Sequence, residues 1–298
     1  MMKRVILWIG LMGLGVARLG AVNSEHQLAA QARAALHQVF EQEENWVKIH
    51  AAEALIAGGE APAMRTRFLA MIPRVDTLPY RVGVWRVLAN TSPTPAERAA
   101  CVDRVEKIFL DLQAPDRSQA IETLCKLRCR LTGPSLALVQ KIAAAGPDKL
   151  RPMAYWSLRF TDDAAAVKNL CTLLHSSEAS QRQIGAYALR LLRETDPVAL
   201  QTLAQVAAAE PADTVAYAYL HSAAFALNAD PAHRADSRAV LENILAHGST
   251  DARFEACHGL LAQVRRTDLP RYIPLLSDAG NDARVGAALT ILSVYGRE

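Results

Sequence analysis

Apolar residues recur at helical spacing from residue 26 onward, in segments of 10–18 residues that short polar breaks separate. Residues at positions i, i+3, i+4 and i+7 share one helix face, so the pattern predicts amphipathic helices. Glycine, proline and asparagine mark the breaks, where they end one helix or begin the next. No run of alternating β-branched residues between turn signals indicates a strand. The sequence therefore predicts an all-α fold.

The second helix of each predicted pair repeats one pattern: a basic residue, a small or apolar residue three positions later, and an apolar residue seven positions later. The units are Lys48/Ala51/Leu55, Arg81/Val84/Leu88, Arg117/Ala120/Leu124, Arg151/Ala154/Leu158, Arg182/Gly185/Leu189, Arg253/Ala256/Leu260 and Arg284/Ala287/Ile291. Asp213/Ala216/Leu220 is an eighth unit without the basic residue. Successive units begin 31 to 40 residues apart. This period predicts an α-solenoid, a superhelix of about eight antiparallel helix pairs.

An aspartate stands one to three residues before the basic residue in several units, at Asp116, Asp148, Asp251 and Asp282. An aspartate at the start of a helix can accept a hydrogen bond from an unpaired backbone N–H group there. We therefore expect these side chains to cap the second helices.

The repeats resemble the HEAT-like repeat family, in particular the short repeats of bilin-lyase type. The segments that carry the resemblance are NWVKIHAAEALIAGG (45–59), DARFEACHGLLAQV (251–264) and NDARVGAALTILSVYG (281–296). The pattern covers about residues 26–298. The resemblance implies the fold, but such arrays serve scaffolds, lyases and nucleic-acid enzymes alike.

The first residues have the layout of a secretory signal peptide: the basic Lys3-Arg4, an apolar run from Val5 to Ala17, and small residues that offer cleavage after Ala17 or Ser24. An uncleaved anchor is the alternative, but the 13-residue run is shorter than the roughly 17–25 residues that span a bilayer. We expect a signal peptide over residues 1–24, a repeat array over 25–298, export to the periplasm or the extracellular space, and no membrane span after cleavage.

Removal of this leader changes the charge of the chain. Residues 1–24 hold three of the 33 basic residues, so 33 − 3 = 30 remain against 30 acidic residues. A neutral mature chain lacks the positive balance that is typical of nucleic-acid-binding proteins. We therefore expect no nucleic-acid partner.

No catalytic or cofactor motif is present in the sequence. The eight histidines show no H-E-x-x-H or zinc spacing, and no phosphate-binding glycine loop or G-x-S-x-G elbow occurs. Some HEAT-like hydroxylases bind iron through His-Glu pairs, and this chain has none. The five cysteines include no C-x-x-C pair and are expected to be buried thiols. We predict no catalytic residue, no metal and no cofactor.

The basic residues of the units form a predicted ladder along the second helices: Lys48, Arg81, Arg117, Arg151, Arg182, Arg253 and Arg284. One interpretation is an anion-binding stripe. The other, which the nearby aspartates favour, is a structural ladder that bonds acidic or carbonyl groups at the turns of adjacent repeats.

Positions 2, 5 and 9 of each unit lie opposite the core positions and are expected to form the concave face. In most units they are polar, but the fourth and fifth units carry an apolar set: Met153, Trp156, Phe160, Ile184, Tyr187 and Leu191. Exposed aromatic patches tend to bind partners. Burial of these positions between neighbouring helices is the structural alternative.

These observations together favour an exported protein-binding scaffold whose partner is another protein or a peptide. A chromophore lyase like the bilin lyases is the alternative that the resemblance brings, and a HEAT-like DNA glycosylase is a weaker one. No extra polar helix follows the last unit. Its final helix is therefore expected to be polar enough on its own, or to dock on a partner or a second copy.

Overall fold

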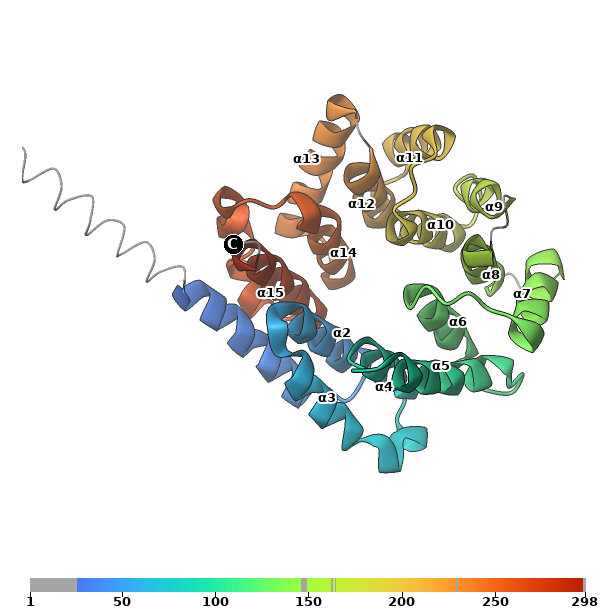
Figure 1. Ribbon diagram of the computed structural model, residues 1–298. Coiled ribbons are helices and arrows are strands. Elements are labelled where there is room, and N and C mark those ends of the chain that lie inside the picture. The colour runs from blue at the N-terminus through green and yellow to red at the C-terminus, as the bar shows by residue number, and fades with distance from the viewer. Residues whose placement is uncertain (1–25, 146–148, 162, 164, 229, 297–298) are drawn as a thin grey trace, which may run out of the picture.

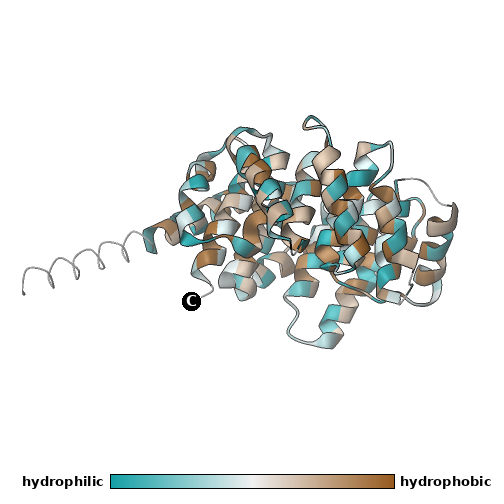
Figure 2. Cartoon of the chain, turned by 90° about the horizontal axis from the view of Figure 1, so that it is seen from above, coloured by the Kyte–Doolittle hydropathy of each residue, from teal (hydrophilic) through white to brown (hydrophobic). Residues whose placement is uncertain are grey.

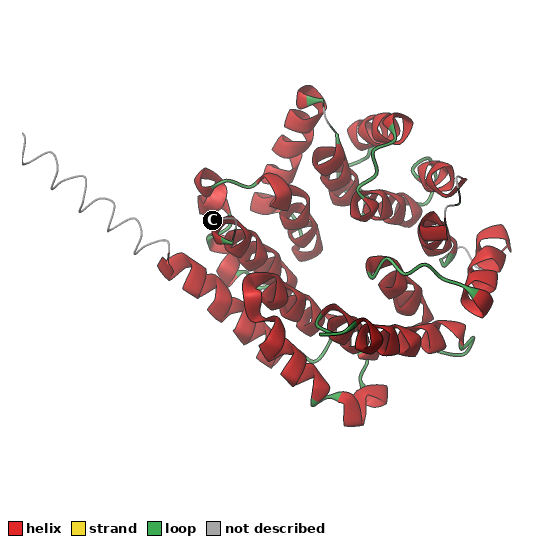
Figure 3. Cartoon of the chain, in the orientation of Figure 1, coloured by secondary structure: helices red, strands yellow, loops and turns green. Residues whose placement is uncertain are grey.

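The computed structural model describes residues 26–298 apart from 146–148, 162, 164, 229 and 297–298, and these residues fold into helices and connecting loops without a strand (Figure 3). The predicted all-α class is thus confirmed. No helix within this part of the chain has the length and apolar character needed to cross a bilayer. The signal peptide predicted for residues 1–24 lies outside the described residues.

The helices alternate between an inner and an outer layer (Figure 1). The inner helices are α2 (Trp46–Leu55), α4 (Arg81–Asn90), α6 (Arg117–Lys126), α8 (Arg151–Leu158), α10 (Ala179–Leu192), α12 (Tyr217–Leu227), α14 (Thr250–Leu260) and α15 (Asn281–Tyr295). The outer helices are a helix over residues 26–42, α3 (Ala61–Leu69), α5 (Pro95–Leu110), α7 (Gly133–Ala145), α9 (Ala165–Leu173), α11 (Pro197–Ala209) and α13 (Pro231–His247).

Short helical turns complete the chain: η1 (Ile56–Glu60), η2 (Ile72–Thr77), η3 (Arg159–Thr161), η4 (Leu261–Gln263), η5 (Arg266–Arg271) and η6 (Pro274–Ser277). Each inner helix from α4 to α14 follows an outer helix in the chain. The last inner helix, α15, instead follows the short turns η5 and η6. Hydrophobic and hydrophilic residues alternate along the helices (Figure 2), as expected of elements that bury one face.

The inner helices form a closed ring. Each contacts the next along the chain, and the last, α15, contacts the first, α2 (Figure 1). Polar contacts join the two ends of the array: His50 Nδ1 lies 2.8 Å from Asp282 Oδ1, and Arg284 Nη2 donates to Gln38 Oε1 at 2.6 Å. The final helix therefore docks on the first repeat of the same chain, which the sequence did not indicate.

The small and apolar members of the repeated pattern form the core between the layers. All sixteen residues at positions 3 and 7 of the eight units are buried. Close packing of the inner helices also needs glycine: a Cβ atom on Gly83 would lie 2.6 Å from Ile49 Cγ1, and one on Gly286 would lie 2.9 Å from Cys257 Cβ. These glycines set the approach of α4 to α2 and of α15 to α14.

Several basic residues of the ladder fasten an inner helix to the end of the outer helix before it. Lys48 Nζ donates to Phe40 O at 2.6 Å, Arg117 Nε to Phe109 O at 2.7 Å, and Arg253 Nη2 to Ala246 O at 3.0 Å. The last carbonyl groups of a helix have no partner within it and carry partial negative charge. The cations thus satisfy these carbonyl groups, and Arg284 makes the same kind of bond to Leu276 O.

Other ladder contacts connect one repeat with the next. Arg81 forms two hydrogen bonds to Asp116, at 2.7 and 2.9 Å, and Arg182 forms two to Glu210, at 2.8 and 2.6 Å. Arg253 Nη1 pairs with Asp278 Oδ2 at 2.5 Å. These are the contacts that the structural interpretation of the ladder describes. Arg151 has an interaction partner as well.

The expected aspartate caps are not formed where the structure describes these residues. Asp116 stands at the N-cap of α6 without a side-chain cap bond, since its carboxylate pairs with Arg81. Asp251 lies within the first turn of α14, which Ser249 caps, and Asp282 bonds His50. Asp148 lies outside the described residues. The carboxylates of Asp116 and Asp282 thus pair with Arg81 and His50 and do not cap their helices.

The substitution Lys48→Met tests the ladder. The Lys48 ammonium is buried and donates to two backbone carbonyl groups, so its loss leaves these acceptors without a partner. We expect the free energy of unfolding in urea to fall by about 2–4 kcal/mol. Lys168→Met, at an exposed position of α9, is the matched control and should change it by less than about 0.5 kcal/mol. Equal stability of the two variants would contradict the structural role.

Candidate ligand-binding cavity

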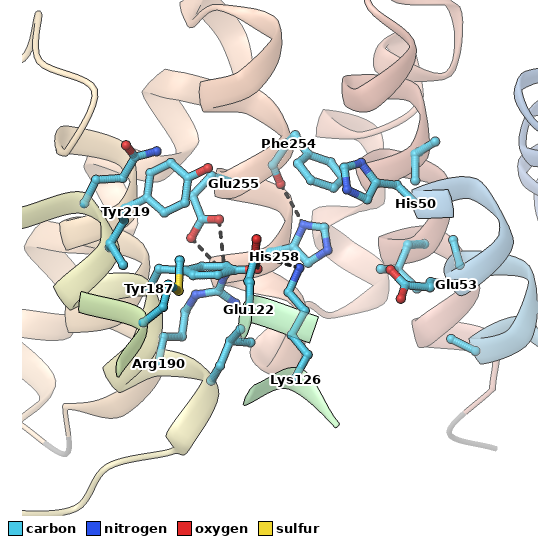
Figure 4. Close-up of a pocket in the computed structure, with 18 residues that line it drawn as sticks. His50, Glu53, Glu122, Lys126, Tyr187, Arg190, Tyr219, Phe254, Glu255 and His258 are labelled. Carbon is cyan, nitrogen blue, oxygen red and sulfur yellow. Dashed lines mark hydrogen bonds and ion pairs between the residues drawn. The ribbon is translucent and has the colours of Figure 1, made fainter. Parts of the chain in front are cut away.

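The ring of inner helices surrounds a cavity of about 490 Å³, which we call the central cavity. Helices α2, α6, α8, α10, α12, α14 and α15 each contribute at least one lining side chain, as does Ala57 of η1. The cavity is within the range of about 300–1,000 Å³ that is usual for small-ligand sites. Figure 4 shows its polar residues gathered from opposite sides of the ring.

Apolar side chains line two sides of the central cavity. Met153, Ile184 and Leu191 come from α8 and α10, and Ala54, Ala57, Val285 and Leu289 come from the closure between α2, η1 and α15. Contact between α15 and α2 therefore supplies one wall. An open array would lack this wall.

Three acid–base pairs lie in or directly behind the lining. Arg86 Nε donates to Glu53 Oε1 at 2.6 Å, Lys126 Nζ lies 2.8 Å from Glu122 Oε1, and Arg190 Nη2 lies 3.0 Å from Glu255 Oε1. Burial raises the pKa of Glu53 and Glu122, but the cations beside them outweigh this effect, and both pKa values are lowered. These two carboxylates are therefore ionised at neutral pH.

Tyr187 stands between two cations at the centre of the site. Lys126 Nζ lies 5.5 Å and Arg190 Cζ 5.7 Å from the centre of its ring. Its hydroxyl donates to Glu122 Oε1 at 3.3 Å, and its ring meets that of Tyr219 edge to face at 5.9 Å. Cation–ring and ring–edge contacts of this kind fix the orientation of the side chains. The polar groups are thus held in place before any ligand arrives.

Glu255 is the most perturbed acid of the cavity. Its side chain is 3% exposed, and burial raises its pKa from 4.5 to about 7, although the charge of Arg190 acts in the opposite direction. Both of its carboxylate oxygens lie close to Arg190 Nη2, Oε1 at 3.0 Å and Oε2 at 3.1 Å. Arg190 Nε is buried and donates no hydrogen bond, so the guanidinium group is the incompletely satisfied member of the pair.

Two histidines and Phe254 form a stacked group beside this pair. The rings of His50 and Phe254 stack at 5.1 Å, and the ring of His258 meets that of Phe254 at 4.4 Å. His258 Nδ1 donates to Phe254 O at 2.9 Å, which leaves Nε2 as an acceptor. Burial and the charge of Arg190 lower the pKa of His258 to about 4, so its ring is neutral at pH 7.

A second cavity, of about 670 Å³, adjoins the first on the side where the inner helices begin, and we call it the mouth. His50, Gln183, Tyr219 and Phe254 line both cavities. Further residues of the mouth include Asp213 before α12, Ser249 and Asp251 at the start of α14, and Asp282 at the start of α15. The two cavities together form an elongated site.

The structure separates the six residues of the predicted partner-binding face. Met153, Ile184, Tyr187 and Leu191 line the central cavity. Trp156 lies behind them, 1% exposed, with its ring in edge contact with Tyr187 at 5.8 Å. Phe160 packs against the core in η3, under the guanidinium group of Arg128. Trp156 is therefore buried between neighbouring helices, as in the alternative interpretation. Partner binding by the set stays a prediction.

Other cavity residues also occupy position 2, 5 or 9 of their units, where the sequence pattern shows only that most side chains are polar: His50, Glu53, Glu122, Lys126, Glu255 and His258. Sequence reasoning missed Gln183, Arg190, Tyr219 and Phe254, which occupy positions 1, 8, 6 and 1 of their units. These positions flank positions 2, 5 and 9 on a helical wheel. A predicted concave face that covered a wider arc of the helical wheel would have included these four residues.

No other chemistry is concentrated in the described part of the chain. No group of three or more His, Cys, Asp or Glu residues there could hold a metal ion. All five cysteines are free, and burial raises the pKa of each thiol, which makes them weak nucleophiles.

No family model matches this sequence, and no curated protein is significantly similar to it. The resemblance to HEAT-like repeats therefore rests on the repeated residues alone and stays a prediction.

Glu255→Gln tests the electrostatics of the cavity. Because the folded state raises the pKa of Glu255 from 4.5 to about 7, the stability this group contributes is present below pH 4.5 and is lost as the pH rises through 7. The variant cannot lose a proton. We expect the unfolding free energy of Glu255→Gln, relative to the natural protein, to rise by about 2 kcal/mol between pH 5 and pH 8.

The lowered pKa of His258 has the opposite effect, because it reduces the unfolding free energy as the pH falls from about 6.5 to 4. His258 is present in both proteins, so this contribution cancels in the difference between them. Glu178→Gln, at an exposed carboxylate, is the matched control. Urea titrations at the two pH values measure the change. A difference for Glu255→Gln that does not vary with pH would show that this carboxyl group is not desolvated.

Proposed function

We propose that this protein is an exported binding module, a HEAT-like α-solenoid of eight helix pairs closed into a ring, which holds an extended segment of a partner protein in its central cavity. The observation that carries the proposal is the cavity itself, because apolar walls surround polar groups that are already oriented. Export rests on the leader pattern of residues 1–24.

The shape and lining of the site support a peptide segment. The central cavity and the mouth share four lining residues, so a ligand that occupies both is elongated. The lining mixes aliphatic side chains with an amide, Gln183, and with two phenols, Tyr187 and Tyr219. Aliphatic surfaces suit apolar side chains, and the amide and phenols offer donors and acceptors to a peptide backbone.

Filling the cavity tests the proposal. Ala57 is exposed and lines the central cavity, so Ala57→Trp places an indole ring in the ligand space without disturbing the core. Hexapeptides are first selected from a random phage-displayed library on the natural protein. We expect the selected peptides to bind Ala57→Trp at least about 100-fold more weakly by fluorescence anisotropy, a loss of roughly 3 kcal/mol.

Ala99→Trp, at an exposed position of the outer helix α5, is the matched control and should bind the peptides unchanged. Melting curves of both variants should agree with that of the natural protein. Peptides that bind Ala57→Trp as well as Ala99→Trp occupy another surface, and that result, or a library that yields no binder, would contradict the proposal.

A further inference from the structure

The charges of the two connected cavities are not evenly distributed. In the central cavity, the three acids Glu53, Glu122 and Glu255 each have a basic partner, Arg86, Lys126 and Arg190 respectively. The acids of the mouth are Asp213, Asp251 and Asp282, and no lysine or arginine lines it. The central cavity is thus balanced, whereas the mouth has an excess of negative charge.

Histidines only partly offset this excess. His50 and His247 are the basic residues that line the mouth, and His50 already bonds Asp282. Asp213 and Asp251 are exposed to solvent at its rim. A cleft lined by one sign of charge raises the local concentration of ions of the other sign. The mouth therefore favours a positively charged group.

Aromatic rings stand at the passage between the cavities. Tyr219, Phe254 and the ring of His50 line both spaces, and Tyr217 lines the mouth. The faces of aromatic rings attract organic cations, and the attraction grows as water is excluded. Rings together with carboxylates are the arrangement that suits an ammonium or guanidinium group carried on an apolar stem.

We propose that the ligand is cationic and amphipathic: a peptide segment whose lysine or arginine side chain lies in the mouth against Asp213, Asp251 and the aromatic rings, while a neighbouring apolar side chain enters the central cavity. This inference rests on the proposed function and adds to it the class of residue that is recognised.

The peptides selected from the hexapeptide library provide the test. We expect enrichment of lysine or arginine next to a leucine, isoleucine or phenylalanine. Replacement of the basic residue by norleucine in a synthetic copy should weaken binding about tenfold by calorimetry. The double variant Asp213→Asn/Asp251→Asn should reduce this preference to threefold or less, whereas Asp103→Asn, at an exposed acid of α5, should leave it unchanged.

The outcomes separate this inference from the proposed function. Peptides that Ala57→Trp excludes but that lack a basic residue, or that bind the norleucine form equally well, support cavity binding and overturn the inference. Spermidine, a free organic cation, is the competitor. If it displaces the peptide with an affinity equal to that of the peptide itself, the recognised cation is a small amine, which overturns the assignment to a peptide side chain.

Discussion

The contact between the first and last inner helices determines the form of the rest of the molecule. Each inner helix contacts the next along the chain, and the series ends where α15 packs against α2. His50, Asp282, Gln38 and Arg284 join the two ends, and the same closure supplies the wall formed by Ala57, Val285 and Leu289. A repeat array that remained open would present a concave surface, whereas a closed ring encloses a site.

Closure also explains why several charged groups are partly or wholly buried. The inner faces of the helices converge on a narrow space, so Glu53, Lys126, Arg190 and Glu255 lose water on folding. Burial of ion pairs is costly and often adds little to stability. Where a protein buries charged groups in place of a more stable apolar core, the position is commonly a functional site. The buried pairs here are consistent with a site whose polar groups are arranged for a ligand.

The repeated pattern predicts the helices and their core well, because positions 3 and 7 depend only on local periodicity. Every such residue, from Ala51 to Ile291, is buried. Positions 2, 5 and 9 include residues that line the central cavity, such as Glu122 and Tyr187. Ring closure could not be predicted, because the rotation between repeats depends on packing details such as the contact of Gly83 with Ile49. The burial of Trp156 is likewise a tertiary effect, since its ring packs against Tyr187 of the next inner helix.

Photocrosslinking at the ring closure tests most directly whether the inner helices form a closed ring. Gln38 contacts Arg284 of α15, 246 residues away in the chain. With benzoylphenylalanine in place of Gln38, we expect irradiation of the monomer to yield an intramolecular crosslink to the segment 281–296, identified by mass spectrometry. Crosslinks confined to the first two repeats, or formed only between two copies of the chain, would contradict a closed ring and the cavity that it surrounds.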